Sequence, residues 1–141
     1  MRSVRRLLVV GATIAALTML VPSVSAATPK SFHLDKLCGS DTSEPLGYVC
    51  IVQQSDFKWI PAGTKVHYLS QTGNVVQAEI TIKNGSTDGA CVWSSDANAI
   101  CTFSTGTGRL SAFHLEVVVT VTGDPAAWTS MWHWDGTYWF G

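Results

Sequence analysis

The segment CTFSTGTGRLSAFHLEVVVTVT, residues 101–122, carries the strongest strand pattern of the chain. Its second half is rich in valine and threonine, and β-branched side chains fit a pleated, half-buried surface. Alternate positions form one fully apolar face, made of Phe113, Leu115, Val117, Val119 and Val121. The positions between them are mixed, as in a sheet with one face on a core and one towards water. We predict a strand over 110–122, long enough to need a bend or bulge.

A tight connection precedes this strand. Gly106 and Gly108 lack a Cβ and adopt positive φ angles without a clash, so residues 105–108 are typical of a turn. A short strand over 99–104 ends at this turn. We therefore predict a hairpin in which 99–104 pairs with the long strand.

The N-terminus has the pattern of a secretory signal peptide. Arg2, Arg5 and Arg6 precede an apolar run over 7–20, and the small residues Val-Ser-Ala end at position 26. The alternative is an uncleaved membrane anchor, but the run is short for a span and ends at a proline. We predict a signal peptide over 1–26, a secreted mature chain and no membrane span after cleavage.

Cleavage leaves residues 27–141, which are 115 residues and enough for one domain with its own core. The mature chain holds six basic and ten acidic residues, so its net charge is −4. An acidic surface without a basic stripe repels phosphates, and we expect no nucleic-acid partner.

The four cysteines predict two disulfides, because an even number in an exported chain indicates a disulfide framework. Three pairings are possible, and we favour Cys38–Cys50 with Cys91–Cys101, since each pair brackets a short segment rich in turn residues. A zinc site is the competing interpretation. The chain has neither a C-x-x-C nor an H-x-x-x-H pair, so we expect no metal.

The mature chain shows strand signals about every ten residues and no helical periodicity. The first residues, 27–37, are expected to be a tail or an irregular strand, and 37–45 a loop. The other strands are predicted over 47–54, 65–70, 75–83, 90–94, 127–134 and 137–140. Asn84-Gly85 and Asp88-Gly89 predict two turns, and Asp135-Gly136 either a hairpin turn or a bulge in one strand. The expected fold is all-β, an antiparallel β-barrel of about eight strands with two disulfides, with a β-sandwich as the alternative.

One set of residues within 65–122 carries a family resemblance. It comprises Gly89, Cys91, Trp93, Cys101, Phe103, Gly106, Thr107, Gly108, Leu110 and Phe113, followed by the valine-rich strand. This pattern resembles small secreted proteins of Gram-positive bacteria, which look like the barrel family of plant dirigent proteins and allene oxide cyclases. Thr105 stands where dirigent proteins have a glycine. The resemblance implies an eight-stranded antiparallel barrel with an apolar cavity, and it carries over no catalytic residue.

An aromatic cluster near the C-terminus supplies the ligand-binding candidates. Six aromatic side chains fall within residues 128–140. Large aromatic rings offer apolar area together with a polar edge, which suits a ligand site. We select Trp132, Trp134, Tyr138 and, from the long strand, Phe113. The alternative is that these rings fill the barrel core or its mouth.

Two polar pairs are weak catalytic candidates. His114 and Glu116 lie two residues apart on one strand face, where a carboxylate could orient an imidazole for proton transfer. The alternative is a solvated surface pair. His67 and Glu79 are expected to face each other on adjacent strands, as an ordinary cross-strand pair. We recognise no nucleophile motif and no cofactor motif.

Three functions compete. The first is a secreted barrel that binds a small hydrophobic or aromatic ligand. The second is an extracellular interaction or inhibitor module that presents the loop 55–64, with Phe57 and Trp59, to another protein. The third is a cyclase or isomerase that acts by shape. We favour binding over catalysis.

Overall fold

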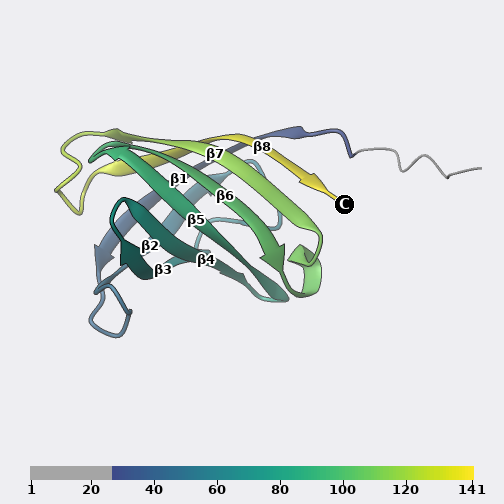
Figure 1. Cartoon of the computed structure of the whole chain (residues 1–141), viewed down its shortest axis with the longest axis horizontal. Helices are drawn as coiled ribbons and strands as arrows, with labels where there is room; N and C mark the ends of the chain where they lie inside the picture. The colour runs from purple at the N-terminus through teal and green to yellow at the C-terminus, as the bar shows by residue number, and fades with distance from the viewer. Residues whose placement is uncertain (1–26) are drawn as a thin grey trace, which may run out of the picture.

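The computed structural model describes residues 27–141 and is a closed barrel of eight antiparallel strands in sequence order (Figure 1). The strands are β1 Lys30–Ser40, β2 Tyr48–Ser55, β3 Lys65–Thr72, β4 Val75–Ile82, β5 Gly85–Ser95, β6 Asn98–Gly106, β7 Phe113–Thr122 and β8 Met131–Phe140. One 3₁₀ turn, η1 Gly108–Leu110, lies between β6 and β7. This confirms the barrel and excludes the sandwich. The predicted signal peptide, 1–26, lies outside the described residues, and within 27–141 no helix is long and apolar enough to cross a membrane.

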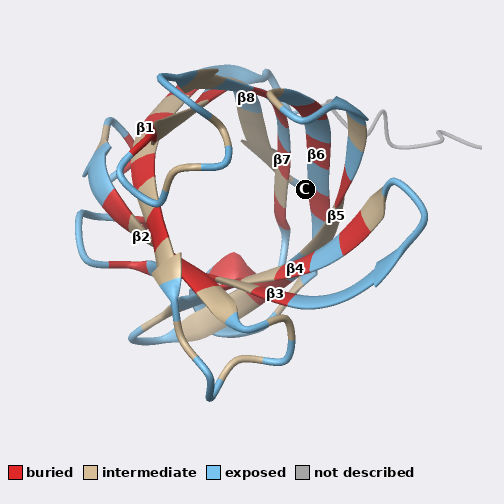
Figure 2. Cartoon of the chain, turned by 90° about the vertical axis from the view of Figure 1, so that its left-hand side faces the viewer, coloured by how far each residue is buried: buried red, intermediate tan, exposed pale blue. Residues whose placement is uncertain are grey.

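Each strand pairs with its chain neighbour, and β1 closes the ring by pairing with β8 (Figure 2). Alternation sends every second side chain inside. In β7 the inward residues Phe113, Leu115, Val117 and Val119 are all at most 1% exposed, which confirms four of the five positions of the predicted apolar face, while Val121 is only partly buried. Val118, on the outer face, is 50% exposed.

Aromatic rings fill one end of the barrel. The loop between β2 and β3 folds into it, and its Phe57 stacks on Phe113 with ring centroids 5.3 Å apart. Tyr138 of β8 packs on Phe57 at 4.4 Å, and Ile60 of the same loop is fully buried. We name this the closed end, and the end where β1 and β7 finish the open end.

Both predicted disulfides are present, Cys38–Cys50 between β1 and β2 and Cys91–Cys101 between β5 and β6. In each pair the two cysteines are direct register partners. All four side chains point into the barrel and are at most 9% exposed. The bonds therefore join neighbouring strands from inside the ring.

Several sequence-based boundaries were wrong. Asp88-Gly89 is not a turn, because β5 continues through it, and a Cβ on Gly89 would meet the Thr102 carbonyl oxygen at 2.2 Å. The glycine permits close approach of two strands rather than a reversal. β1 extends to Ser40, into the predicted loop. The strand predicted over 110–122 begins only at Phe113, after η1, and β7 pairs with β6 and β8 without a register shift, so the bulge expected within it is absent.

β8 is one continuous strand through Asp135-Gly136, and its pairing with β1 and β7 has no register shift, so neither the hairpin turn nor the bulge predicted there is present. Gly136 is the register partner of Val117 on β7 and of Phe32 on β1. A Cβ at Gly136 would lie 2.0 Å from the carbonyl oxygen of Glu116. The missing side chain lets β7 approach β8 closely where β8 closes the ring.

Gly136→Ala should therefore destabilise the barrel by at least about 2 kcal/mol, because the new methyl group collides with backbone that cannot move freely. Thermal unfolding measured by circular dichroism checks this. Gly39→Ala in β1 is the matched control, since a Cβ there meets nothing within 4 Å, and it should change stability by less than about 0.5 kcal/mol. Equal melting temperatures for the two variants would contradict the close approach.

Candidate functional site

The open end of the barrel contains a cavity of about 300 Å³. Five of its eleven lining residues are aromatic, and the β7–β8 loop forms one side. Its lining residues are Lys36, Cys38, Tyr48, Cys50, Tyr68, Trp93, Trp132 and residues 125–128.

Lys36 enters this cavity because of strand alternation. The inward positions of β1 hold Phe32, Leu34, Lys36 and Cys38, so a lysine occupies a place in a row of core residues. Its side chain is only 2% exposed. A register shift between Asp35 and Lys36 in the pairing with β2 lies next to it. Lysine is almost never buried to this extent without a charged partner.

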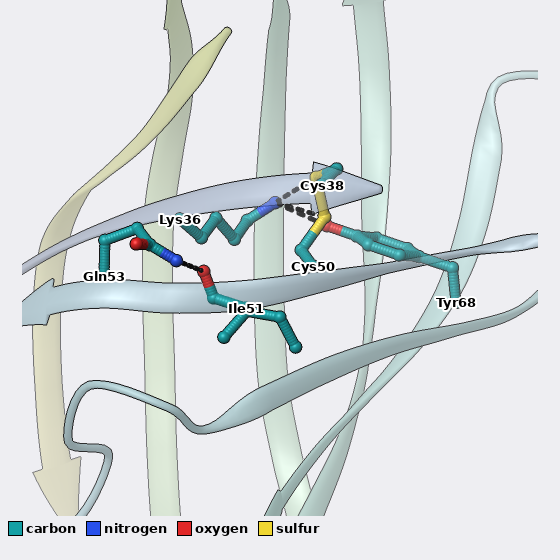
Figure 3. The surroundings of a disulfide bond; sticks show 6 residues. All are labelled: Lys36, Cys38, Cys50, Ile51, Gln53 and Tyr68. Atoms are coloured by element: carbon teal, nitrogen blue, oxygen red, sulfur yellow. Dashed lines mark hydrogen bonds between the residues drawn. A yellow bond between two sulfur atoms is a disulfide. The ribbon is translucent and has the colours of Figure 1, made fainter. Parts of the chain in front are cut away.

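The Lys36 amine lies against the disulfide and a tyrosine (Figure 3). Nζ donates a hydrogen bond of 2.8 Å to the Tyr68 hydroxyl oxygen. Its other acceptors are sulfur atoms, Cys50 Sγ at 3.4 Å and Cys38 Sγ at 3.8 Å. Within residues 27–141 no carboxylate lies within ion-pair distance of Nζ. The amine is thus buried with one oxygen partner and no counter-charge.

Aromatic rings surround the same nitrogen. Lys36 Nζ lies 5.0 Å from the ring centroid of Trp134, 5.3 Å from that of Tyr68 and 5.8 Å from that of Trp132. Ring faces attract a cation, so they offset part of the cost of burying the charge.

Burial determines the pKa of the Lys36 amine. Desolvation lowers the pKa of Lys36 from 10.5 to about 7, because the charged form loses its water. Desolvation also raises the pKa of Tyr68, and the neighbouring Tyr48 adds to that rise. Near neutral pH the amine is therefore present in both protonation states, while the tyrosine stays protonated.

The four predicted ligand-binding residues fall in different parts of the barrel. Trp132 lines the open-end cavity. Trp134 is fully buried among core residues, packs on Phe103 and has an indole N–H without a hydrogen-bond acceptor. Phe113 and Tyr138 belong to the closed end. The structure brings Trp132 and Trp134 together around Lys36, and it places the other two away from them.

A larger recess of about 580 Å³ lies at the closed end, along the outside of the β2–β3 loop. Lys58, Lys65 and Arg109 line it, and all three side chains are exposed. It is more open to solvent than the open-end cavity and contains no buried ionisable group. The open-end cavity is therefore the better candidate for a functional site, although it is smaller, because it alone of the two contains a buried amine.

The weak catalytic candidates lie on the outer surface. His114 stacks on Trp139 with ring centroids 5.2 Å apart, and Glu116 is exposed. Among the hydrogen bonds of residues 27–141, none joins these two side chains. His67 and Glu79 are register partners as expected, but the His67 ring contacts the carboxylate of Glu44 at 2.9 Å.

A chain of polar side chains that the sequence reasoning missed crosses β1, β8 and β7 on the outer face. His33 Nδ1 lies 2.6 Å from Asp135, and its Nε2 lies 3.2 Å from Asp35. Asp35 also contacts His133 Nδ1 at 2.5 Å, and His133 Nε2 lies 2.6 Å from the Thr122 hydroxyl. The hydrogen bond that the His33 ring donates to the Asp135 carboxylate raises the pKa of His33. We assign this chain to the seam where the barrel closes, since its members join β1 to β8 and β8 to β7.

The sequence contained a signal for Lys36 that was not used. Phe32 and Leu34 alternate with the polar residues His33 and Asp35, which indicates a strand whose apolar face continues through Lys36. The prediction of a tail or an irregular strand over 27–37 hid this pattern, because only a regular strand such as β1 directs Lys36 inward.

Comparison of the chain with family models, curated proteins and solved structures found no match. The resemblance to dirigent proteins and allene oxide cyclases therefore stays a prediction.

Lys36→Met should stabilise the protein near neutral pH by roughly 1–4 kcal/mol, because it replaces a poorly compensated buried amine with an apolar chain of similar length. The stability of the wild type depends on pH because its folded and unfolded states bind different numbers of protons. Between about pH 7 and 10.5 the unfolded state holds a proton that the folded state lacks, so wild-type stability should rise with pH across this window. Chemical denaturation at several pH values should show this slope in the wild type and a flatter profile in the variant. A less stable variant would contradict the uncompensated amine.

Asp135→Asn should lower the pKa of His33 towards its ordinary value of 6.5, because the strongest partner of the imidazolium is removed. The raised pKa stabilises the fold below about pH 6.5, and this contribution is lost as pH rises through the folded-state pKa. NMR titration of the histidine ring protons measures the shift. Asp124→Asn, on the β7–β8 loop, is the control and should leave His33 unchanged.

Proposed function

We propose that this protein is a secreted binding protein whose open end holds one small, flat, apolar or aromatic molecule. The observation that carries the proposal is the aromatic-walled cavity that ends at a single buried amine. Ligand sites have this composition, in which apolar and aromatic walls enclose a few placed polar groups. Two disulfides, no free cysteine among residues 27–141 and the signal-like N-terminus support secretion.

The rings of the wall form a group of three and a separate pair. Tyr48 lies between Tyr68 and Trp128, with ring centroids 5.1 and 5.7 Å away. Trp93 and Trp132 meet edge to face at 5.6 Å. Flat ligands gain contact area from rings that already lie at fixed angles, since little side-chain freedom remains to be lost on binding.

The size of the cavity limits the ligand. At about 300 Å³ it lies at the lower end of the usual range for small-molecule sites, roughly 300–1,000 Å³. The rest of the interior is filled by the protein's own side chains, including Trp134, Phe103 and Leu115. A molecule of one or two rings fits this space better than a lipid with a long chain.

Trp128 supports access from solvent. It lies on the β7–β8 loop at the mouth of the cavity and is 50% exposed. A large apolar ring exposed at a cavity entrance is available for contact with a ligand that enters there.

The interaction-module alternative has less support from the loop that suggested it. Phe57 is 6% exposed and Ile60 is fully buried, so the apolar side chains of the β2–β3 loop pack inside the closed end. Trp59 is partly buried against Phe140, with ring centroids 5.1 Å apart. Little apolar surface remains on this loop for a protein partner.

Titration of the mature protein with a neutral two-ring probe, 2-naphthalenemethanol, tests the binding function. We expect saturable binding by calorimetry, with NMR shift changes at Trp93, Trp128 and Trp132. Trp132→Ala should weaken binding by about tenfold or more, because a buried aromatic contact contributes at least about 1.4 kcal/mol.

Trp139→Ala is the matched control, since Trp139 lies on the same strand but lines a groove at the closed end. It should leave the affinity unchanged. Loss of binding in Trp139→Ala but not in Trp132→Ala would place the ligand at the wrong end of the barrel.

A further inference from the structure

We propose that the ligand of the open-end cavity is a small aromatic carboxylic acid whose carboxylate pairs with Lys36. This inference rests on the proposed binding function and specifies the chemical class of the ligand. The interior near this cavity holds buried N–H donors, those of Lys36 and Trp134, for which the protein supplies too few acceptors.

Lys36 has more donors than the protein satisfies well. An ammonium group has three N–H donors, and Nζ finds one oxygen, that of Tyr68 at 2.8 Å. Its other neighbours are the sulfurs of Cys38 and Cys50, which are weak acceptors. The structure places no carboxylate of residues 27–141 beside it. A ligand oxygen with a negative charge supplies both the missing acceptor and the missing charge.

Two further donors strengthen this account. The Tyr68 oxygen accepts the hydrogen bond from Lys36, which leaves its own O–H to donate. Lys36 and Tyr68 both line the cavity, so the two oxygens of one carboxylate suit the N–H and the O–H together. Trp134, whose ring lies 5.0 Å from Nζ, has a buried N–H without an acceptor. The interior of this end therefore has an excess of donors.

Other charged groups near the cavity are few. The tyrosines Tyr48 and Tyr68 are the only other titratable side chains in its lining, and burial raises the pKa of both, so they stay neutral. The cysteines form a disulfide and do not titrate. Asp96 and Asp124 are exposed and line an adjoining recess. Solvent screens them from a ligand held inside, whereas the ion pair with Lys36 forms out of water.

The protonation of Lys36 couples to such a ligand. In the free protein, burial places its pKa at about 7. A carboxylate in contact favours the charged amine and raises this pKa, so binding above neutral pH takes up a proton. A neutral ligand of the same shape has no such effect, which separates the ion pair from simple apolar contact.

Calorimetry with two probes of similar shape, 2-naphthoate and 2-naphthalenemethanol, tests the inference on the mature, disulfide-bonded protein. Near pH 6 the acid should bind about tenfold or more tightly than the alcohol. Near pH 8, titrations in buffers with different ionisation enthalpies should show uptake of close to one proton with the acid and none with the alcohol.

The ratio of the two affinities in variants identifies the group responsible. Lys36→Met should abolish the preference for the acid, whereas Lys58→Met, an exposed lysine at the closed end, should keep it. If Lys36→Met does not fold, the number of protons that the wild type takes up on binding the acid near pH 8 tests the inference. A number near zero would overturn it.

Equal affinities of acid and alcohol, or a preference that survives in Lys36→Met, would overturn the carboxylate inference while leaving the binding function intact. Binding of neither probe would overturn both. The two failures are therefore distinguishable.

Discussion

A closed ring of eight strands sends every second side chain into one shared interior, and the rest of this structure follows from that constraint. Seven of the strands supply apolar residues or cysteines to most inward positions, but β1 supplies Lys36. The ring leaves this side chain no route to the outer surface except through the open end. The amine therefore shares the interior with two disulfide sulfurs and three aromatic rings. The free-energy cost of burying it lowers the stability of the barrel.

The two ends of the barrel use aromatic residues differently. At the closed end Phe57 packs on its aromatic neighbours, and no lysine, arginine or carboxylate side chain belongs to that cluster. At the open end the rings surround a cavity and an amine that lacks a counter-charge. Groups with a strongly shifted pKa in a cavity are frequent at functional sites, and buried charge that weakens a fold is more readily explained by binding than by stability. This asymmetry is the physical basis of the function that we propose.

Much of the fold was predictable because alternation and turn chemistry agree along most of the chain. The apolar face of β7 and both disulfide pairs follow from local pattern and spacing. The errors arose where a glycine serves close strand contact instead of a turn, at Gly89 and Gly136, since a sequence does not reveal which backbone will lie beside it. The candidate site was only partly predictable. Trp132 was selected from composition, but Lys36 was not, because a lone lysine is normally exposed and its burial depends on closure of the ring.

The central claim is that Lys36 is a buried amine without a counter-charge at the floor of the open-end cavity. NMR titration of the ligand-free protein, with isotope-labelled lysine side chains assigned by the Lys36→Met variant, tests it most directly. The account predicts that one lysine titrates near pH 7, far below the ordinary lysine value of 10.5, and that this signal is missing in the variant. A Lys36 signal that titrates near 10.5 would show a solvated or paired amine and would contradict the account.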